Sequence, residues 1–413
     1  MRLHILLGIL ILYVAASTAQ KLSSQAAALE RLLEGVNQFS GEFVQAVAKT
    51  NRNNFVVSPI GAYLALTDAS FGARRHTEDV FNNLLKLTGV PSDMKKMGAL
   101  MINGLFNSFD KSELRVASGI FVSSEIELNS NFIADTTKYR CRPAQSANFW
   151  NPVEATNFIN SWSDKCTNGG VRNIIDHNLD RNTQAALFSA VNFKGTPMYR
   201  LVPLSASEMV AEGIAFTYEN GTTGQLPFKS GFHWVQYGEY PEVGASFIEI
   251  PYKSDVFYHN KSMFIIIPKL SSTLAYLEKN FHRISVKKLY ERSTRTPLTI
   301  TLPQFEIKSH LDIGIILKKM GFEHIFDTKK ADFSGIFSRK NFCTKNVFIP
   351  DIAITRVVQK TSINIDGKGI KYNPPYDDSY FFEFEALSPF YVIVATAGKN
   401  PINILTARFT GKE

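Results

Sequence analysis

A group of basic residues late in the chain has the spacing needed to bind a polyanion. Lys288, Arg292 and Arg295 lie at positions i, i+4 and i+7, and Arg283 and Lys287 stand beside them. On a helix this spacing gathers positive charge on one face, where the sulfate groups of a polysaccharide could be neutralised. A solvated helix face has the same spacing, so polyanion binding and simple solvation are both open interpretations.

A second chemistry, N-linked glycosylation, is indicated at two places. Asn220 in Asn-Gly-Thr and Asn260 in Asn-Lys-Ser both match the acceptor pattern and lie in turn-like sequence. This modification requires entry into the secretory pathway, which the N-terminus also predicts. Arg2 and His4 precede an apolar run that is shorter than the about 20 residues of a membrane span, and small residues follow it up to Ala19.

We therefore expect residues 1–19 to be a signal peptide and residues 20–413 to form a secreted, extracellular glycoprotein. The chain has 413 residues, of which 45% are hydrophobic and 20% are charged, and no linker or repeat divides it. This composition favours one large domain. We expect a monomer with no nucleic-acid partner and no membrane attachment.

No sequence motif supports an enzyme. The chain has no Gly-Xaa-Ser-Xaa-Gly elbow, no His-Glu-Xaa-Xaa-His or paired-cysteine metal motif, and no glycine-rich phosphate loop. We expect no catalytic residue, no metal and no cofactor. The three cysteines leave two interpretations open: a Cys141–Cys166 disulfide, or three unpaired thiols including Cys343.

Periodicity predicts helices early in the chain and strands late, the pattern of an α+β protein. Ser58 is well placed to cap a helix that starts at Pro59 and stops near Gly72. The other expected helices include 24–50, one capped by Thr77, 151–167, 274–290 and 312–320, and the expected strands include 116–122, 183–193 and 298–307. The apolar 183–193 run is typical of a strand buried on both faces.

Several sequence blocks resemble the serpin family of serine protease inhibitors, and they occur in the order found in that family. The matching blocks are Asn54–Ile60, Phe158–Trp162 with Thr167, Ile250–Lys253, Ser262–Pro268, Leu302–Ile307 and Pro389-Phe390. The resemblance extends over roughly residues 25–410. It implies a single serpin domain with three β-sheets, about nine helices and an exposed reactive-centre-like loop at about residues 370–388.

The resemblance also implies a mechanism. In inhibitory serpins a protease cleaves the exposed loop, which then inserts as a new central strand in the largest sheet and traps the enzyme. Such a strand needs backbone N–H donors and small side chains. Inhibitory members carry a Glu/Gly/Thr hinge followed by alanines, whereas this hinge consists of Gly367, Lys368, Gly369, Ile370, Lys371, Tyr372, Asn373, Pro374 and Pro375.

These hinge residues depart from what insertion requires. Tyr372, Pro374 and Tyr376 would share one face of the strand, and the two prolines remove two N–H donors. The loop is also several residues shorter than in inhibitory members.

Inhibitory serpins also have a small polar cluster that controls sheet opening. Ser58, Gly61, Ser189 and Ser388 are the positions that match this cluster here, and Pro197 replaces a tryptophan expected near the top of the sheet. We expect a non-inhibitory serpin that binds an extracellular partner. The partner could be a serine protease held without trapping, a small hydrophobe, a glycosaminoglycan or a receptor. Inhibition by loop insertion is the alternative.

Overall fold

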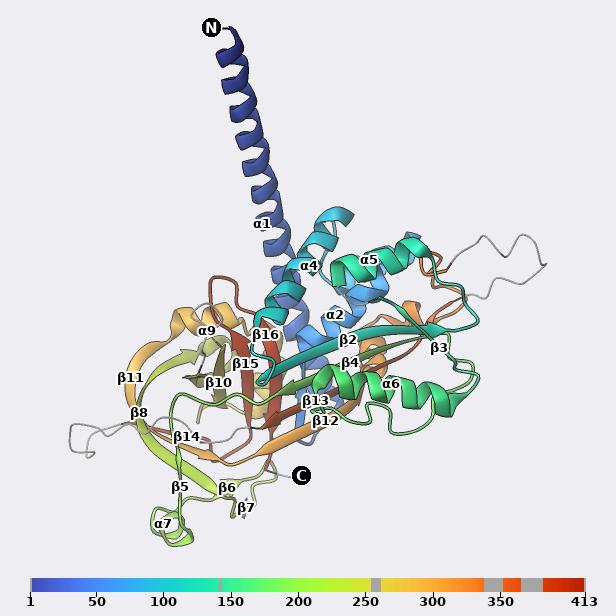
Figure 1. The fold of residues 1–413 in the computed structure, drawn as a ribbon. Helices are drawn as coiled ribbons and strands as arrows, with labels where there is room; N and C mark the ends of the chain where they lie inside the picture. The colour runs from blue at the N-terminus through green and yellow to red at the C-terminus, as the bar shows by residue number, and fades with distance from the viewer. Residues whose placement is uncertain (1, 141–142, 254–260, 338–351, 365–381, 412–413) are drawn as a thin grey trace.

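A computed structural model describes residues 2–140, 143–253, 261–337, 352–364 and 382–411. Ten α-helices and sixteen strands form within these residues, with most helices in the first half of the chain (Figure 1). The strands make three sheets of nine, five and two strands. The predicted α+β class is therefore confirmed.

Helix α1 (Arg2–Thr50) contains the helix expected at 24–50 as its second half. This half is amphipathic, and Val36, Phe39 and Phe43 are fully buried. A second helix, α2 (Pro59–Ser70), begins as predicted, because the Ser58 hydroxyl accepts a hydrogen bond from the Gly61 amide at 3.1 Å. All but the last residue of α2 are buried.

The five-stranded sheet has the order β12-β13-β4-β2-β3. Its strands are β12 (Glu306–Asp312), β13 (Ile354–Asn364), β4 (Ala185–Phe193), β2 (Leu114–Ser123) and β3 (Gln145–Ala147). Helix α6 (Pro152–Thr167) crosses in front of this sheet in Figure 1, and α2 packs against β2 and β4.

Strand β4 is buried along its whole length, as its apolar run predicted. Leu187 and Val191 pack in the core shared with α2, whereas Phe188 and Ala190 pack in a second core with Trp162 of α6. Because side chains alternate between the faces of a strand, a strand covered on both faces needs apolar residues at every position.

The nine-stranded sheet has the order β1-β16-β15-β10-β9-β8-β11-β14, and β5 pairs with β8 outside this path. Its strands are β1 (Phe55–Val57), β5 (Val202–Pro203), β8 (Phe228–Tyr240), β9 (Ala245–Pro251), β10 (Lys261–Pro268), β11 (Thr294–Pro303), β14 (Phe382–Glu385), β15 (Phe390–Thr396) and β16 (Asn403–Phe409). Strands β6 (Phe216–Thr217) and β7 (Thr223–Gly224) form the small sheet.

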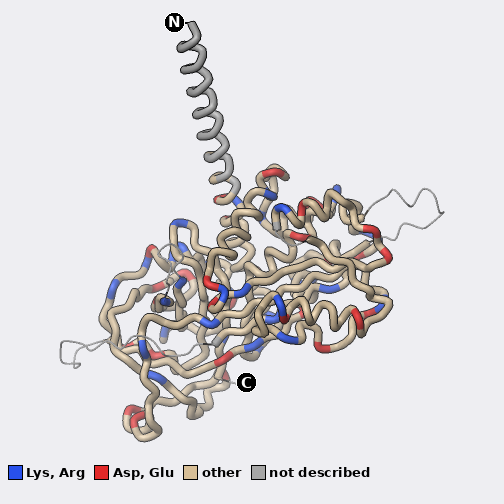
Figure 2. The backbone as a smooth tube through the Cα atoms, viewed as in Figure 1, with Lys and Arg blue, Asp and Glu red and all other residues tan. Residues whose placement is uncertain are grey.

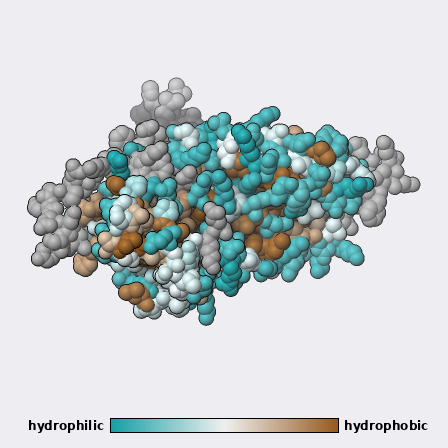
Figure 3. Space-filling model, turned by 90° about the horizontal axis from the view of Figure 1, so that it is seen from below, coloured by the Kyte–Doolittle hydropathy of each residue, from teal (hydrophilic) through white to brown (hydrophobic). Residues whose placement is uncertain are grey.

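The remaining helices surround these sheets. They are α3 (Arg75–Leu84), α4 (Ser92–Ser108), α5 (Ser130–Arg140), α7 (Ala206–Ala211), α8 (Leu274–Lys279), α9 (Val286–Arg292) and α10 (Ile313–Lys319). On the face seen in Figure 3, hydrophilic residues cover most of the surface and hydrophobic residues form separate patches.

Two elements that we expected to be continuous are each divided in the structure. The helix expected at 274–290 is divided into α8, a 3-10 turn (Phe281–Arg283) and α9, because Asn280 and Ile284 leave the helical conformation. The strand expected at 298–307 is divided into β11 and β12, which belong to different sheets. Phe305 lies between them and stacks on Phe409 with ring centroids 4.9 Å apart.

A buried charged network joins β16, α8 and the segment after α1. Arg408 is 0% exposed; its Nε lies 3.0 Å from Oε1 of Glu278, and its Nη1 donates to the Asn51 carbonyl at 3.0 Å. The Tyr391 hydroxyl donates to the same Glu278 oxygen at 2.9 Å. Burial raises the pKa of Glu278, and the Arg408 charge opposes this shift.

Removing Arg408 should destabilise the domain strongly. An Arg408→Ala variant leaves the Glu278 carboxylate buried without its main partner, which costs about 3–5 kcal/mol of the free energy of unfolding. Urea unfolding followed by circular dichroism measures this loss. Lys111→Ala, which removes an exposed cation, is the control and should change the unfolding midpoint little. Equal midpoints for the two variants would contradict the assigned role of Arg408.

Candidate functional site at the seam between β4 and β13

Strands β4 and β13 pair directly in the centre of the five-stranded sheet. Their ladder is parallel and runs from Ile354 opposite Ala185 to Ile363 opposite Phe193. We call this ladder the seam. The hinge predicted at 367–375 follows β13 in sequence, so a loop that inserted beside β13 would enter the five-stranded sheet.

A buried side chain, Gln359 of β13, adds a link between the two strands of the seam. Its Oε1 accepts from the Ser58 amide and its Nε2 donates to the Ser58 carbonyl, each at 2.8 Å. The Nε2 group also lies 3.3 Å from the hydroxyl of Ser189, which is its register partner on β4. Gln359 thus ties β13 to β4 and to the start of α2, in a place where unpaired polar groups would be costly.

Three of the four predicted cluster residues meet here. Ser58, Gly61 and Ser189 lie together, and the Ser58 hydroxyl donates to the Ile404 carbonyl at 2.7 Å. Gly61 permits this close approach, because a Cβ atom there would lie 2.5 Å from the Ser189 hydroxyl and 2.9 Å from a Val191 methyl. A larger residue at position 61 would force the cluster apart.

Ser388 is not part of this cluster, and its assignment is corrected. It is exposed in the turn between β14 and β15, whereas Ser58, Ser189 and Gln359 are at most 1% exposed. Gln359 occupies the fourth place and was missed by sequence reasoning. The signal that could have identified it is the register of β13 with β4, which places Gln359 opposite Ser189.

The hinge residues Gly367, Lys368, Gly369, Ile370, Lys371, Tyr372, Asn373, Pro374 and Pro375 lie outside the described residues. The far end of the expected loop is described and differs from expectation. Residues 382–385 form β14, which pairs in parallel with β11, with Phe382 opposite Leu298. The connection from β13 to β14 is thus limited to the 17 residues 365–381.

The upper end of the seam is filled by aromatic rings and a proline. Phe193, the last residue of β4, packs edge-on against Tyr252 with ring centroids 4.9 Å apart. Pro197 forms an isolated bridge with Tyr252, at the place where the resemblance led us to expect a tryptophan. A Cβ atom at Gly195 would lie 2.5 Å from each ring, so the chain needs glycine to pass between them.

The basic residues do not form the single helical face that their spacing predicted. Arg283 lies in the 3-10 turn, Lys287, Lys288 and Arg292 lie on α9, and Arg295 lies on β11. Figure 2 shows that basic and acidic residues are interspersed over the molecule.

Arg292 is occupied by a structural contact. Its guanidinium forms a bidentate pair with Glu242 at 2.5 and 2.6 Å and lies 4.5 Å from the Tyr240 ring centroid. This hydrogen bonding lowers the pKa of Glu242 to about 2. Arg283, Lys287, Lys288 and Arg295 are exposed, although Lys287 lies 3.8 Å from Glu291. The predicted basic site is therefore reduced to these four residues.

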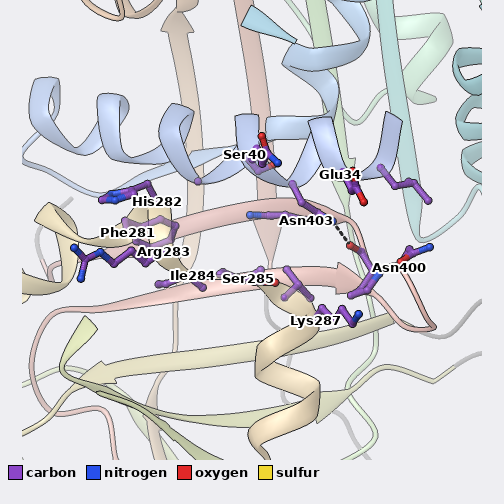
Figure 4. Close-up of a pocket in the computed structure, with 17 residues that line it drawn as sticks. Glu34, Ser40, Phe281, His282, Arg283, Ile284, Ser285, Lys287, Asn400 and Asn403 are labelled. Atoms are coloured by element: carbon purple, nitrogen blue, oxygen red, sulfur yellow. Dashed lines mark hydrogen bonds between the residues drawn. The ribbon is translucent and has the colours of Figure 1, made fainter. Parts of the chain in front are cut away.

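A cavity of about 300 Å³ lies beside these basic residues, between α1 and the chain from Phe281 to Lys287 (Figure 4). Glu34 and Ser40 line it from α1, and Arg283 and Lys287 line the opposite side. Asn400 and Asn403 add polar groups to a wall that also contains apolar side chains such as Phe281 and Ile393.

Of the two asparagines predicted to be glycosylated, Asn220 lies within the described residues and Asn260 does not. Asn220 is exposed in the turn between β6 and β7, and its Oδ1 accepts from the Thr222 amide at 3.2 Å and hydroxyl at 2.7 Å. Asn260 lies outside the described residues. Ser262 of its motif is 2% exposed and donates to Glu249 at 2.6 Å.

The cysteine alternatives stay open, because Cys141 and Cys343 lie outside the described residues and Cys166 lies near the end of α6. Within the described ranges, no group of three or more His, Cys, Asp or Glu side chains could hold a metal ion. The described part of the chain also has no helix long and apolar enough to cross a membrane.

Comparisons with known proteins agree with this architecture. Residues 34–406 match the family model "Serpin (serine protease inhibitor)". Alaserpin of Manduca sexta is 26% identical over 346 residues, which cover 83% of each chain. Serine protease inhibitor 42Dd of Drosophila melanogaster is 27% identical over 314 residues, 74% of this chain and 78% of that protein.

Solved structures show the same fold. Native protease nexin-1 with heparin superposes with a TM-score of 0.75 at 21% identity, covering 92% of this chain and 99% of that one. Serpin-12 of Manduca sexta gives a TM-score of 0.77 at 20% identity, covering 91% and 98%. With a family model that matches most of its length, the chain belongs to the serpin family.

Proposed function

We propose that this protein is a secreted, non-inhibitory serpin that acts by binding an extracellular partner. The observation that carries the proposal is the pair Pro374-Pro375 within the 17 residues that connect β13 to β14. These residues would have to supply any strand inserted at the seam. A strand between β4 and β13 has neighbours on both sides, so each residue must contribute to one ladder or the other.

Insertion of this connection at the seam would carry several local free-energy costs. Two prolines deny the incoming strand two N–H donors, and each sheet carbonyl left unpaired costs ~1–3 kcal/mol. Tyr372 and Tyr376 would add bulk on one face, and overpacking of this kind costs about 1–3 kcal/mol. Opening the seam also breaks the contact of Gln359 with Ser189. These costs oppose the gain from adding a strand.

Inhibition by loop insertion is the second candidate, and the names of the relatives favour it. Several related proteins are named as protease inhibitors, including the Drosophila melanogaster protein described above. Incubation with trypsin, chymotrypsin and elastase separates the two functions. An SDS-stable covalent complex with any of these enzymes would establish the inhibitor.

Cutting the loop between Tyr372 and Phe384 should leave the melting temperature nearly unchanged. The reason is that the released arm cannot complete the ladders of β4 and β13. Differential scanning calorimetry of the intact and the nicked protein measures the difference. A nicked protein that melts far above the intact one would contradict the proposal, because such a rise requires insertion.

The matched control is a variant whose loop has the backbone donors and small side chains that an inserted strand needs. A variant with Pro374→Ala, Pro375→Ala, Tyr372→Ala and Tyr376→Ala regains two N–H donors and loses the bulk. After cutting, this variant should melt at a higher temperature than before cutting. No change in this variant would mean that the loop residues are not the obstacle.

A polyanion such as a sulfated glycosaminoglycan is the partner that the surface supports best. Exposed Arg283, Lys287 and Lys288 lie close together in sequence, Arg283 and Lys287 line the cavity described above, and Arg295 lies on β11. One solved relative in fold, protease nexin-1, is described with heparin. An extracellular protein, such as a serine protease bound without trapping, is the other candidate partner.

The variant Arg283→Ala/Lys287→Ala/Lys288→Ala should elute from heparin at lower salt than the unaltered protein. Without these three cations, fewer counterions are displaced from the sulfate groups of heparin on binding. Gradient chromatography on immobilised heparin measures the elution salt. The control is Lys111→Ala/Arg181→Ala/Lys329→Ala, which removes three other exposed cations. Equal losses in both variants would show that net charge alone is responsible.

The compartment is a part of the proposal with its own test. Full-length protein expressed in insect cells should appear in the medium with Gln20 at its N-terminus, because the apolar leader is removed. Asn220→Gln should reduce the mobility shift caused by N-glycosidase, and Asn53→Gln, at an exposed site without the motif, should not. Retention inside the cells with Met1 in place would refute secretion.

A further inference from the structure

A pocket of about 260 Å³ lies among the helices of the first half of the chain. Its lining comes from the end of α2, from α3, from the first turns of α4 and from Asp135 of α5. Figure 1 shows α4 and α5 beside each other above α2. We call this space the helical pocket. It shares no lining residue with the cavity beside α1 that Figure 4 shows.

Two neighbouring lysines of α4 line the helical pocket, and their amino groups have different partners. Nζ of Lys95 donates to the amide oxygen of Asn82 at 2.6 Å, whereas the carboxylate of Glu78 lies 3.8 Å away, beyond hydrogen-bond distance. Nζ of Lys96 donates to the carboxylate of Asp135 at 2.7 Å. The Lys95 side chain is also the less exposed of the two, at 16% against 26%.

The surroundings of Lys95 favour an amine without its proton. A half-buried ammonium group loses hydration, and a neutral amide returns less of that loss than a carboxylate does. Burial lowers the pKa of Lys95, although the negative charges of Glu78 and Asp79 act against this shift. A lysine nitrogen is a nucleophile only when its lone pair is free. Lys95 therefore has the environment of a reactive lysine on the wall of a pocket.

Other groups on the wall indicate which small molecules fit beside Lys95. Arg74 adds a cation whose Nη1 donates to the carbonyls of Phe71 and Ala73 at 2.9 and 2.7 Å. Among the described residues, no carboxylate pairs with this guanidinium, so its charge can attract an anionic group. Phe71 and Leu87 add apolar surface, against which a flat ring can pack. The volume of the pocket limits the ligand to a small molecule.

We propose that the helical pocket binds small aldehydes that carry an anionic group, and that Lys95 holds them as an imine. The Lys95 nitrogen attacks the carbonyl carbon, a C=N bond replaces the C=O bond, and the oxygen leaves as water. Nothing is oxidised or reduced, and hydrolysis reverses the reaction. The pocket belongs to the body of the domain, so this binding is independent of whether the loop inserts.

Pyridoxal 5′-phosphate is a suitable probe, because it combines an aldehyde, an aromatic ring and a phosphate. The mature, full-length protein is incubated with one equivalent at pH 7.5, the imine is reduced with borohydride, and peptide mass spectrometry identifies the labelled lysines. Lys95 should carry most of the label. Pyridoxal, which lacks the phosphate, should label Lys95 more slowly because it gains nothing from Arg74.

Exchanging the partners of the two lysines tests whether the surroundings of the amine set its reactivity. Asn82→Asp places a carboxylate beside Lys95 and favours its protonated form, so the label on Lys95 should fall to that on exposed Lys111. Asp135→Asn removes the carboxylate from Lys96, so the label on Lys96 should rise.

Substitution of the lysines themselves gives a matched pair of variants. Lys95→Arg keeps the positive charge but cannot form the imine, so the label at this position should be lost. Lys96→Arg, the control at the neighbouring position, should leave the label on Lys95 in place. Thermal melting followed by circular dichroism checks that each variant is folded.

Three results would overturn the proposal. The first is label spread over the exposed lysines with no excess on Lys95, which is measured on the unaltered protein and needs no variant to fold. The second is equal labelling of Lys95 by pyridoxal and by its phosphate, which would remove the anionic group from the ligand class. The third is undiminished labelling of Lys95 in folded Asn82→Asp, which would mean that its neutral partner is irrelevant.

Discussion

The direct parallel pairing of β13 with β4 is the constraint around which the rest of the domain is arranged. Parallel neighbours cannot be joined by a tight turn, so β4 and β13 come from distant parts of the chain. The two halves of the sheet therefore meet at the seam through non-covalent contacts. Gln359 reinforces the ladder from the α2 side, and the segment between α6 and β4, residues 168–183, packs against the opposite face. Burial on both faces explains why seven of the nine residues of β4 are apolar, and why Ser189, its polar side chain toward α2, has a partner in Gln359.

The buried Arg408 network serves a different purpose from the seam contacts. It joins β16, α8 and the segment after α1 at a place where no new strand is expected, and its charges are matched by Glu278 and Glu219. A buried charge with several fixed partners specifies one packing of these elements, because any other packing leaves it unpaired. The contacts at the seam are mostly neutral amide and hydroxyl groups, which lose less when they separate.

The fold class, the cap of α2 and the doubly buried strand β4 could be predicted, because each depends on local sequence or on one-dimensional periodicity. The break between α8 and α9 could not, because Asn280 ends the helix by donating to the Tyr276 carbonyl, a contact that competes with helix continuation. Gln359 could not be found for a different reason: its role depends on register between two strands that are far apart in sequence. Ser388 was assigned to the polar cluster because it is polar and lies near the matching place in the sequence. Polarity and sequence position alone do not show which residues lie together in the fold.

A serpin fold without loop insertion, as proposed above, is physically consistent with the seam and the connection that follows β13. The fold needs β4, β13, α2 and α6 to pack as described, and those contacts are made by residues of the domain body. Insertion needs a further property, a connection whose residues can act as a strand, and nothing in the packing of the body demands it. A sequence can therefore place Pro374-Pro375 in the connection while leaving β4 and β13 intact. On this proposal, a binding surface such as the one around Arg283 and Lys287 would be retained by a body that does not open.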